Sequence, residues 1–242
     1  MKRDERPLSA VPAWVHAALA ASLALQLAAQ ATRQPLTPAA ADLPPPPRAE
    51  ALRLASLGEP EAGARIAMLY LQTYDLGGTN ALPYRKLDYQ RLAEWLKAIL
   101  ELDPRSEYPL FSAARIYAEV PDAARSRIML GFIYEEFLRD PNRRWPWLAH
   151  AALVAKHELG DLALARRYAS AIDRRTTTDR VPLWARQMEI FILEDMNELE
   201  AAKIMLGGLL ASGAIRDPNE ARFLKRRLEE LEARLQAGKT VK

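Results

Sequence analysis

Apolar residues recur three and four positions apart along most of the chain, which is the spacing of one face of an α-helix. Two of these patterns end in similar segments, from Leu100 to Pro104 and from Phe137 to Pro141, at an offset of 37 residues. An offset of this size, with two amphipathic helices in each unit, is typical of helical-repeat arrays. The pattern therefore predicts an all-α chain built from helical hairpins.

Breaks in the apolar pattern separate the expected helices. The last of these helices is charged on most of its faces. The helices are expected over residues 49–57, 61–74, 88–103, 108–119, 122–139, 145–158, 161–174, 181–196, 198–211 and 219–237. Asp88 is a suitable N-cap and Gly160 a suitable C-cap residue. The last helix has one narrow apolar stripe, made of Leu224, Leu228, Leu231 and Leu235. Its other faces are charged, which is what a terminal capping helix needs.

The N-terminus has the order of a targeting segment. Residues 1–10 are basic, and residues 11–31 form an alanine-rich apolar run. The run has about the 20 residues that a bilayer span needs, which favours a single-pass transmembrane anchor; the alternative is a signal peptide cleaved after Ala31. Basic residues precede the run and few follow it, so we expect the N-terminus inside and the folded region in the periplasm. The protein is then either held in the inner membrane or soluble in the periplasm after cleavage.

Two further segments divide the rest of the chain. Residues 32–48 are rich in proline and alanine and include the run Pro44 to Pro47, which predicts a stiff polyproline spacer. A four-proline run is also compatible with an SH3-type ligand, although that function fits poorly with an extracytoplasmic domain. The helical region is expected over 49–237, with a short tail at 238–242. Within it, the turn-rich loop 75–87 is either an irregular connection or a functional loop.

Composition supports the helical assignment and excludes some kinds of site. Half of the residues are hydrophobic, mainly alanine and leucine, and the chain has no cysteine. Disulfides, thiolate metal sites and cysteine nucleophiles are therefore excluded. The 34 basic and 31 acidic residues alternate along the chain, so a nucleic-acid partner is disfavoured. The two basic stretches, residues 174–180 and 222–227, contain or adjoin acidic residues and read as solvated surface.

The motifs of catalysis are missing from the sequence. His150 and His157 are seven residues apart, two helical turns, which is too far for one metal ion. Adjacent acidic pairs such as Glu135 and Glu136 diverge by about 100 degrees on a helix and do not converge on a substrate. Nucleotide-binding and serine-hydrolase signatures are absent. We therefore expect a protein that is not an enzyme, with no cofactor, no metal and no small-molecule substrate.

The segment from Asn142 to Trp147 is the most distinctive short stretch, because it holds two arginines and two tryptophans around Pro146. One interpretation is structural, with Pro146 starting a helix, both tryptophans wedged between hairpins and both arginines exposed. The other is an aromatic and guanidinium patch that binds a peptide, an acidic headgroup or a glycan. The structural interpretation is favoured, because aromatic residues near repeat junctions normally fill the core.

The chain resembles the tetratricopeptide repeat family over about residues 61–237. Leu92, Leu96, Ile99 and Pro104 fall on positions of the family's pattern, and Ala165 and Ala202 match its small packing residue at the same offset of 37 residues. The family's period is shorter, 34 residues, and several of its small positions are large here. The whole chain also resembles a set of membrane-anchored proteobacterial proteins of unassigned function, which carry a Pro-rich linker and the sequence Arg-Trp-Pro-Trp-Leu near Trp145. The resemblance implies a TPR-like solenoid of helical hairpins with an N-terminal transmembrane or signal helix.

In a TPR array the first helix of each pair lines the concave surface, and this resemblance nominates residues that bind a partner. They are Tyr108, Phe111, Arg115, Trp147, His150, His157 and Gln187, to which the patch interpretation adds Arg143 and Arg144. The expected function is a membrane-tethered scaffold or adaptor whose partner is a protein associated with the membrane. Two alternatives remain: an assembly or quality-control subunit of an inner-membrane complex, and a cytoplasmic helical-repeat protein associated with nucleic acid.

Overall fold

The computed structural model describes residues 12–32, 42–75, 83–213, 215 and 217–240, and all regular structure in these residues is helical. The chain divides into two compact units, residues 1–41 and 42–242. In the first unit, α1 (Ala13–Thr32) coincides with the apolar run of the sequence, and Trp14, Leu19 and Leu25 on it are exposed. Within the described part of the chain, no helix is both long and apolar enough for a membrane crossing. The anchor and the signal peptide both stay predictions.

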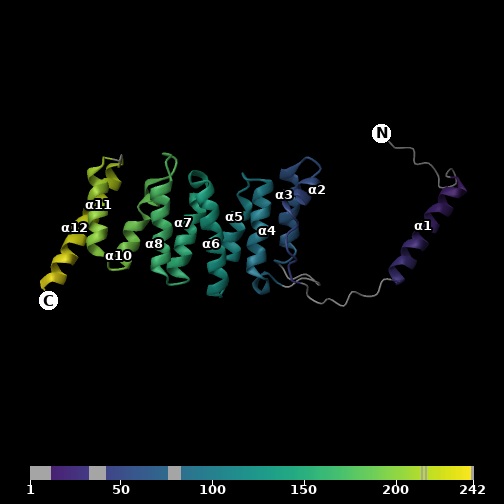
Figure 1. Cartoon of the computed structure of the whole chain (residues 1–242), viewed down its shortest axis with the longest axis horizontal. Coiled ribbons are helices and arrows are strands. Elements are labelled where there is room, and N and C mark those ends of the chain that lie inside the picture. The colour runs from purple at the N-terminus through teal and green to yellow at the C-terminus, as the bar shows by residue number, and fades with distance from the viewer. Residues whose placement is uncertain (1–11, 33–41, 76–82, 214, 216, 241–242) are drawn as a thin grey trace, which may run out of the picture. The chain divides into compact units, whose positions relative to one another are not determined.

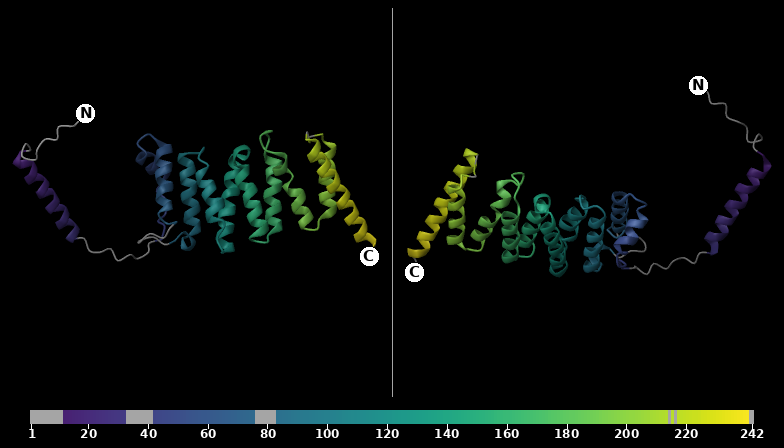
Figure 2. Two further views of the ribbon diagram at one scale, coloured as in Figure 1. Left: turned by 180° about the vertical axis from the view of Figure 1, so that it is seen from behind. Right: turned by 45° about the horizontal axis from the view of Figure 1, so that its top comes forward.

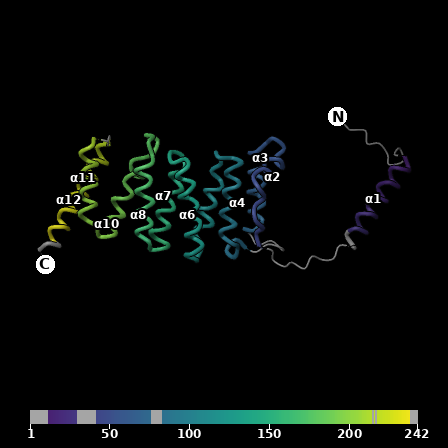
Figure 3. Tube along the Cα trace, viewed as in Figure 1, coloured from purple at the N-terminus to yellow at the C-terminus, as the bar shows by residue number. Residues whose placement is uncertain are grey.

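The second unit contains the remaining helices, which follow one another side by side in chain order (Figures 1 and 3). They are α2 (Ala49–Ala55), α3 (Pro60–Gln72), η2 (Tyr84–Lys86), α4 (Tyr89–Leu102), α5 (Tyr108–Ser112), η3 (Ala113–Tyr117), α6 (Ala123–Arg139), α7 (Pro141–His157), α8 (Leu162–Arg175), α9 (Leu183–Arg186), α10 (Met188–Asp195), α11 (Leu199–Ala211) and α12 (Pro218–Thr240). Each long helix packs against the next long helix along the chain, as the two further views of Figure 2 also show. The prediction of an all-α fold is confirmed for the described residues.

Capping hydrogen bonds and a glycine with positive φ mark several helix ends. The carboxylates of Asp88, Asp122 and Asp161 each accept hydrogen bonds from backbone N–H groups of the turn that follows, so α4, α6 and α8 begin at capped positions. Gly160 follows α7 with φ +62°, a left-handed conformation that glycine adopts without strain. The predicted cap at Asp88 is therefore confirmed, whereas the C-cap of α7 is Glu158 and Gly160 lies in the turn after it.

Three predicted helices differ from the structure in detail. The helix expected at 108–119 is α5 followed by the π-helical turn η3, and the helix expected at 181–196 is divided into α9 and α10 at Gln187. The helix expected at 145–158 begins earlier, because Pro141 occupies the first turn of α7 and Pro146 lies inside the helix rather than at its start. Pro146 removes one backbone donor near the N-terminal end of α7.

The core consists of two groups of buried side chains. The larger group runs from Leu43 to Ile192 and contains many alanines, of which Ala151, Ala155 and Ala169 are fully buried between α7 and α8. Small side chains at these positions let the two helices approach closely. The smaller group joins α10, α11 and α12 through Leu193, Leu206 and related residues. Leu224 and Leu231 of the predicted capping stripe are fully buried in it, while Leu228 packs against its edge.

The folded unit begins before the first predicted helix, which corrects the interpretation of residues 32–48 as a spacer throughout. The Leu43 side chain is completely buried, and its carbonyl oxygen accepts a hydrogen bond of 3.1 Å from Arg91 Nη1. Trp95 Nε1 donates to the carbonyl oxygen of Pro44 at 2.7 Å. Residues 42–44 are thus part of the domain, since the Leu43 side chain is buried and α4 binds the carbonyl oxygens of Leu43 and Pro44.

The loop predicted at 75–87 lies partly outside the described residues, which lack 76–82. At its beginning, Asp75 accepts a hydrogen bond of 2.9 Å from Tyr117 Oη. At its end, Leu87 is buried and the Tyr84 ring lies 5.9 Å from the Tyr117 ring. The two ends of the loop therefore meet the same tyrosine of η3.

Candidate protein-interaction surface

Three aromatic side chains from α5 and α7 form a continuous row. The Tyr108 and Phe111 rings are stacked with centroids 6.0 Å apart, and the Phe111 and Trp147 rings meet edge to face at 5.9 Å. Tyr108 is 41% exposed and Phe111 is 39% exposed, whereas Trp147 is half-buried. Large aromatic side chains that share contacts yet keep open faces are typical of binding surfaces. We call Tyr108, Phe111, Arg115, Trp147 and His150 the aromatic surface.

Glu107, immediately before α5, fixes the α7 side of this row. Its Oε2 atom accepts a hydrogen bond of 2.6 Å from Trp147 Nε1, and its Oε1 atom pairs with Arg143 Nε at 3.1 Å. Arg143 Nη2 also donates to the carbonyl oxygen of Pro104. The polar tip of Trp147 is therefore satisfied inside the protein, and its ring is held in one orientation for contact.

Charged and polar groups border the Phe111 and Trp147 rings, because Arg115 follows Phe111 by four residues and His150 follows Trp147 by three. Arg115 Nη1 lies 3.4 Å from His150 Nδ1, and His150 Nε2 lies 2.9 Å from Glu119 Oε1. Because the guanidinium is a donor only, Nδ1 accepts and Nε2 is left to donate to the carboxylate. The Arg115 side chain remains 53% exposed and its ion pair with Glu119 is long, 3.7 Å, so the guanidinium is accessible to a partner's carboxylate.

The aromatic surface continues onto α3. Tyr108 Oη accepts a hydrogen bond from Gln72 Nε2. Beside this contact is a hollow with a cavity volume of about 500 Å³, whose lining includes Met68, Leu69 and Tyr108. Leu69 is 63% exposed. An apolar hollow next to an aromatic row supplies space for a partner's side chain.

In the segment from Asn142 to Trp147, some residues hold neighbouring helices together and others belong to the aromatic surface or its surroundings. Asn142 Oδ1 accepts a hydrogen bond of 2.8 Å from the backbone N–H of Thr177, and the Trp145 ring packs edge to face on Trp184 at 5.6 Å. Arg143 and Trp147 instead belong to the network around Glu107. Neither of the two interpretations of this segment therefore holds for all of its residues.

Two nominated residues are buried, which corrects their assignment to a partner-binding surface. Arg144 is 4% exposed and pairs with the equally buried Glu136, with 2.6 Å between Nη1 and Oε2. Arg144 was also expected to be exposed in the structural interpretation, and that expectation is wrong as well. Gln187 is 4% exposed and donates a hydrogen bond of 3.2 Å to Glu220 on α12. Both side chains connect helices.

The remaining nominated residue, His157, is exposed at the last position of α7. It is two helical turns beyond His150, and it does not take part in the network of Arg115 and Glu119. The structure thus brings five nominated residues together with Arg143 beside them. Sequence reasoning missed Gln72, Glu107 and Glu119, although Gln72 and Glu107 each lie 36 residues before their partners.

Two groups with shifted pKa values lie near the C-terminal end of α3. Burial raises the pKa of the Asp75 carboxyl, against the lowering effect of the Tyr117 hydrogen bond. Burial likewise raises the pKa of the Tyr74 phenol to about 12. Within the described residues, no three side chains of histidine, cysteine, aspartate or glutamate gather as metal ligands would.

Comparison of the chain with protein-family models, with curated proteins and with solved structures finds no match in any of the three.

Proposed function

We propose that the protein is a non-enzymatic interaction scaffold, and that it binds an extended segment of a partner protein across the aromatic surface. The observation that carries this proposal is the row of Tyr108, Phe111 and Trp147, whose rings contact one another and still face solvent. Rigid aromatic side chains contribute much contact area at a small entropic cost, and they dominate binding energy at many interfaces.

The repeat architecture supports an extended binding mode. Side-chain hydrogen bonds recur between residues 33 to 36 positions apart, in the pairs Gln72–Tyr108, Glu107–Arg143, Arg115–His150, Arg127–Asp161, Asn142–Thr177, Gln187–Glu220 and Glu194–Arg227. Neighbouring units of a repeat array contact each other through equivalent positions, so separations within such a narrow range are what stacked hairpins produce. We propose on this basis that residues 61–237 form a TPR-like solenoid, with α12 as its cap.

The chemistry of the surface indicates the partner segment. The aromatic row and the hollow beside Tyr108 suit apolar side chains, while Arg115 suits a carboxylate. We therefore propose a partner segment with apolar residues that also carries an acidic residue near one end. Such a segment would lie across α3, α5 and α7, because Gln72, Phe111 and Trp147 come from these three helices.

A photo-crosslinking amino acid placed at position 111 tests the proposal. Phe223 on α12 is the matched control position, since it is a phenylalanine with a similar exposure, 49%. The proposal expects a defined partner protein to be crosslinked from position 111 and not from 223. Once the partner is identified, Phe111→Ala should weaken its binding by about tenfold or more, whereas Phe223→Ala should leave it unchanged. Equal crosslinking from both positions would contradict the proposal.

A second pair of variants tests the tryptophan. Trp147→Ala should lower the affinity for the same partner, because it removes the end of the row. Trp184→Ala is the control, since Trp184 is 54% exposed and lies outside the aromatic surface. Circular dichroism of both variants distinguishes lost binding from lost folding.

We also propose that the domain functions in the periplasm, either held at the inner membrane or released after cleavage, next to a membrane-associated partner. The support is the order of basic residues, Lys2, Arg3 and Arg6, before the apolar run. A C-terminal alkaline phosphatase fusion should be active, and a fluorescent protein that folds only in the cytoplasm should stay dark. The reverse result would contradict this location and return attention to the cytoplasmic alternative.

A further inference from the structure

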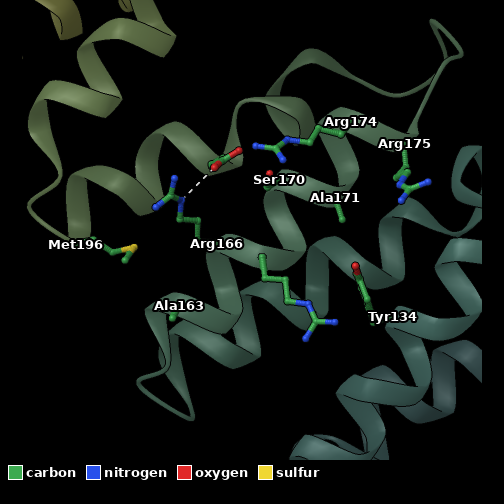
Figure 4. A pocket seen from close by; sticks show the side chains of 10 residues that line it. Tyr134, Ala163, Arg166, Ser170, Ala171, Arg174, Arg175 and Met196 are labelled. Carbon is green, nitrogen blue, oxygen red and sulfur yellow. Dashed lines mark hydrogen bonds and ion pairs between the residues drawn. The ribbon is translucent and has the colours of Figure 1, made fainter.

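A second surface, on α8, has a different chemistry from the aromatic surface. It is a hollow with a cavity volume of about 470 Å³, shown in Figure 4. Its lining includes the guanidinium groups of Arg166, Arg167, Arg174 and Arg175, and a single carboxylate, that of Glu189. The cationic side chains thus outnumber the anionic one around a space large enough for a small ligand.

Two of the arginines are fixed by neighbouring helices. Arg166 Nε pairs with Glu189 Oε1 at 3.1 Å, and the Glu189 side chain is almost completely buried. The Arg167 guanidinium lies over the Tyr134 ring, 4.6 Å from its centroid. Tyr134 in turn stacks on Tyr168 at 5.3 Å. The only carboxylate of the lining is therefore occupied, and Arg167 is held in place by an aromatic face.

The other two arginines are available for a ligand. Within the described residues, the guanidinium groups of Arg174 and Arg175 form no hydrogen bond or ion pair. Burial raises the pKa of the adjacent Asp173 carboxyl, and the Arg174 charge is among those that oppose this rise. Arg174 lies seven residues after Arg167, which is two helical turns and about 10 Å along the axis. Ser170 and Ala171 lie between them, and their small side chains leave the space open. The hollow therefore has guanidinium groups at both ends, and the small side chains of Ser170 and Ala171 form its floor.

We propose that this hollow binds a small soluble ligand that carries two phosphate groups joined by a short neutral body. Guanidinium groups donate several hydrogen bonds in the planar geometry that phosphate oxygens accept. The hydroxyl groups of Tyr134 and Ser170 add donors that suit the same oxygens. One phosphate pairs with Arg167 and the other with Arg174 and Arg175, while the neutral body lies over Ser170 and Ala171.

Isothermal titration calorimetry of the full chain with a hexose bisphosphate tests the proposal, at about 0.15 M salt so that exposed charges are screened. A hexose monophosphate and inorganic phosphate are the comparison ligands. The bisphosphate should bind saturably with one site and about tenfold more tightly than either of them, because it engages both ends. Equal, weak binding of all three ligands would overturn the proposal and leave only a cationic patch.

Variants locate the site. Arg167→Gln and Arg174→Gln should each weaken bisphosphate binding about tenfold, while Arg226→Gln, which removes the same charge from the exposed face of α12, should leave it unchanged. Ser170→Leu fills the floor without changing the charge, and it should weaken binding to a similar extent. If Ser170→Leu binds normally, the hollow is not the site.

Two further probes test whether the hollow binds a larger polyanion instead of a small ligand. Vesicles with an anionic phosphate headgroup and a short single-stranded RNA are each tested by co-sedimentation or gel shift at the same salt concentration. If the proposal holds, Arg174→Gln binds the vesicles and the RNA as strongly as the parent chain does. Binding of either probe that is lost in this variant, with no bisphosphate binding, would overturn it.

Discussion

The indole Nε1 atom of Trp95 donates a hydrogen bond of 2.7 Å to the carbonyl oxygen of Pro44, which lies 51 residues earlier in the chain. This contact, together with the pairing of Arg91 with the Leu43 carbonyl oxygen, attaches the proline run to α4. The Leu43 side chain enters the core at the same place. The proline run therefore stabilises the first hairpin of the domain at its N-terminal side.

Leu43→Ala should lower the free energy of unfolding by about 2–4 kcal/mol, because it removes a completely buried side chain and leaves a cavity. Leu54→Ala is the matched control: Leu54 is 79% exposed, and its loss should cost less than about 0.5 kcal/mol. Urea unfolding monitored by circular dichroism measures both changes. Equal effects of the two substitutions would show that residues 42–44 do not stabilise the domain.

The sequence predicted the helices well and this attachment not at all, for a physical reason. A helix repeats its apolar positions every three or four residues, so each helix is marked several times over. Leu43 is a single apolar residue before a run of prolines, and one residue has no periodicity. Its burial depends on the Trp95 and Arg91 donors, which lie about 50 residues away.

Arg144→Met should destabilise the fold by about 3–5 kcal/mol, because it removes the buried partner of the Glu136 carboxylate. Arg139→Met is the control, since Arg139 pairs with the same carboxylate from an exposed position and should contribute about 1 kcal/mol or less. Thermal and urea unfolding of the two variants give the comparison. A similar small loss in both would mean that Glu136 is solvated without Arg144.

The same pair explains why the candidate surface could be predicted only in part. Arg143 and Arg144 are neighbours in sequence, but they point about 100 degrees apart on α7. One reaches Glu107 at the surface and the other reaches Glu136 in the core. Helical periodicity places a residue on a face to within about one position. Which of two adjacent arginines is buried depends on the packing of α6, which the sequence of α7 does not contain.

Asp75→Asn should make the protein more stable than the parent chain at neutral pH, and the advantage should shrink as the pH falls. Burial raises the pKa of the Asp75 carboxyl in the folded protein, so the folded state holds this proton more tightly than the unfolded state. The parent chain then loses stability as the pH rises from about 4 through the raised pKa. Asparagine keeps an acceptor for Tyr117 Oη and does not ionise.

Asp161→Asn provides the comparison of opposite sign. The backbone N–H of Leu164 and the side chain of Arg127 lower the pKa of the Asp161 carboxyl, so its contribution to stability is present above the ordinary value and lost as the pH falls through the lowered one. This variant should therefore be less stable than the parent chain at neutral pH and approach it in acid. Urea midpoints measured between about pH 3 and 7 follow both differences. Parallel curves for the two variants would contradict the assigned shifts.

Leu231→Ala should loosen the C-terminal helices while the rest of the domain remains folded. Leu231 is completely buried in the smaller core group, which holds α10, α11 and α12 together, and this substitution should cost about 2–5 kcal/mol. In the repeat array proposed above each unit contacts only its neighbours, so the expected loss is local. Ile204→Ala on α11 is the control, because Ile204 is 71% exposed.

Hydrogen exchange measured by mass spectrometry distinguishes a local from a global effect. In Leu231→Ala, amides of α11 and α12 should exchange faster, while those of α7 and α8, which belong to the larger core group, should keep their protection. Arg227→Met should have the same pattern, since Arg227 pairs with the buried Glu194 of α10. Faster exchange in every helix would mean that the two core groups unfold as one unit, and α12 would then be an integral part of a single core rather than a terminal cap.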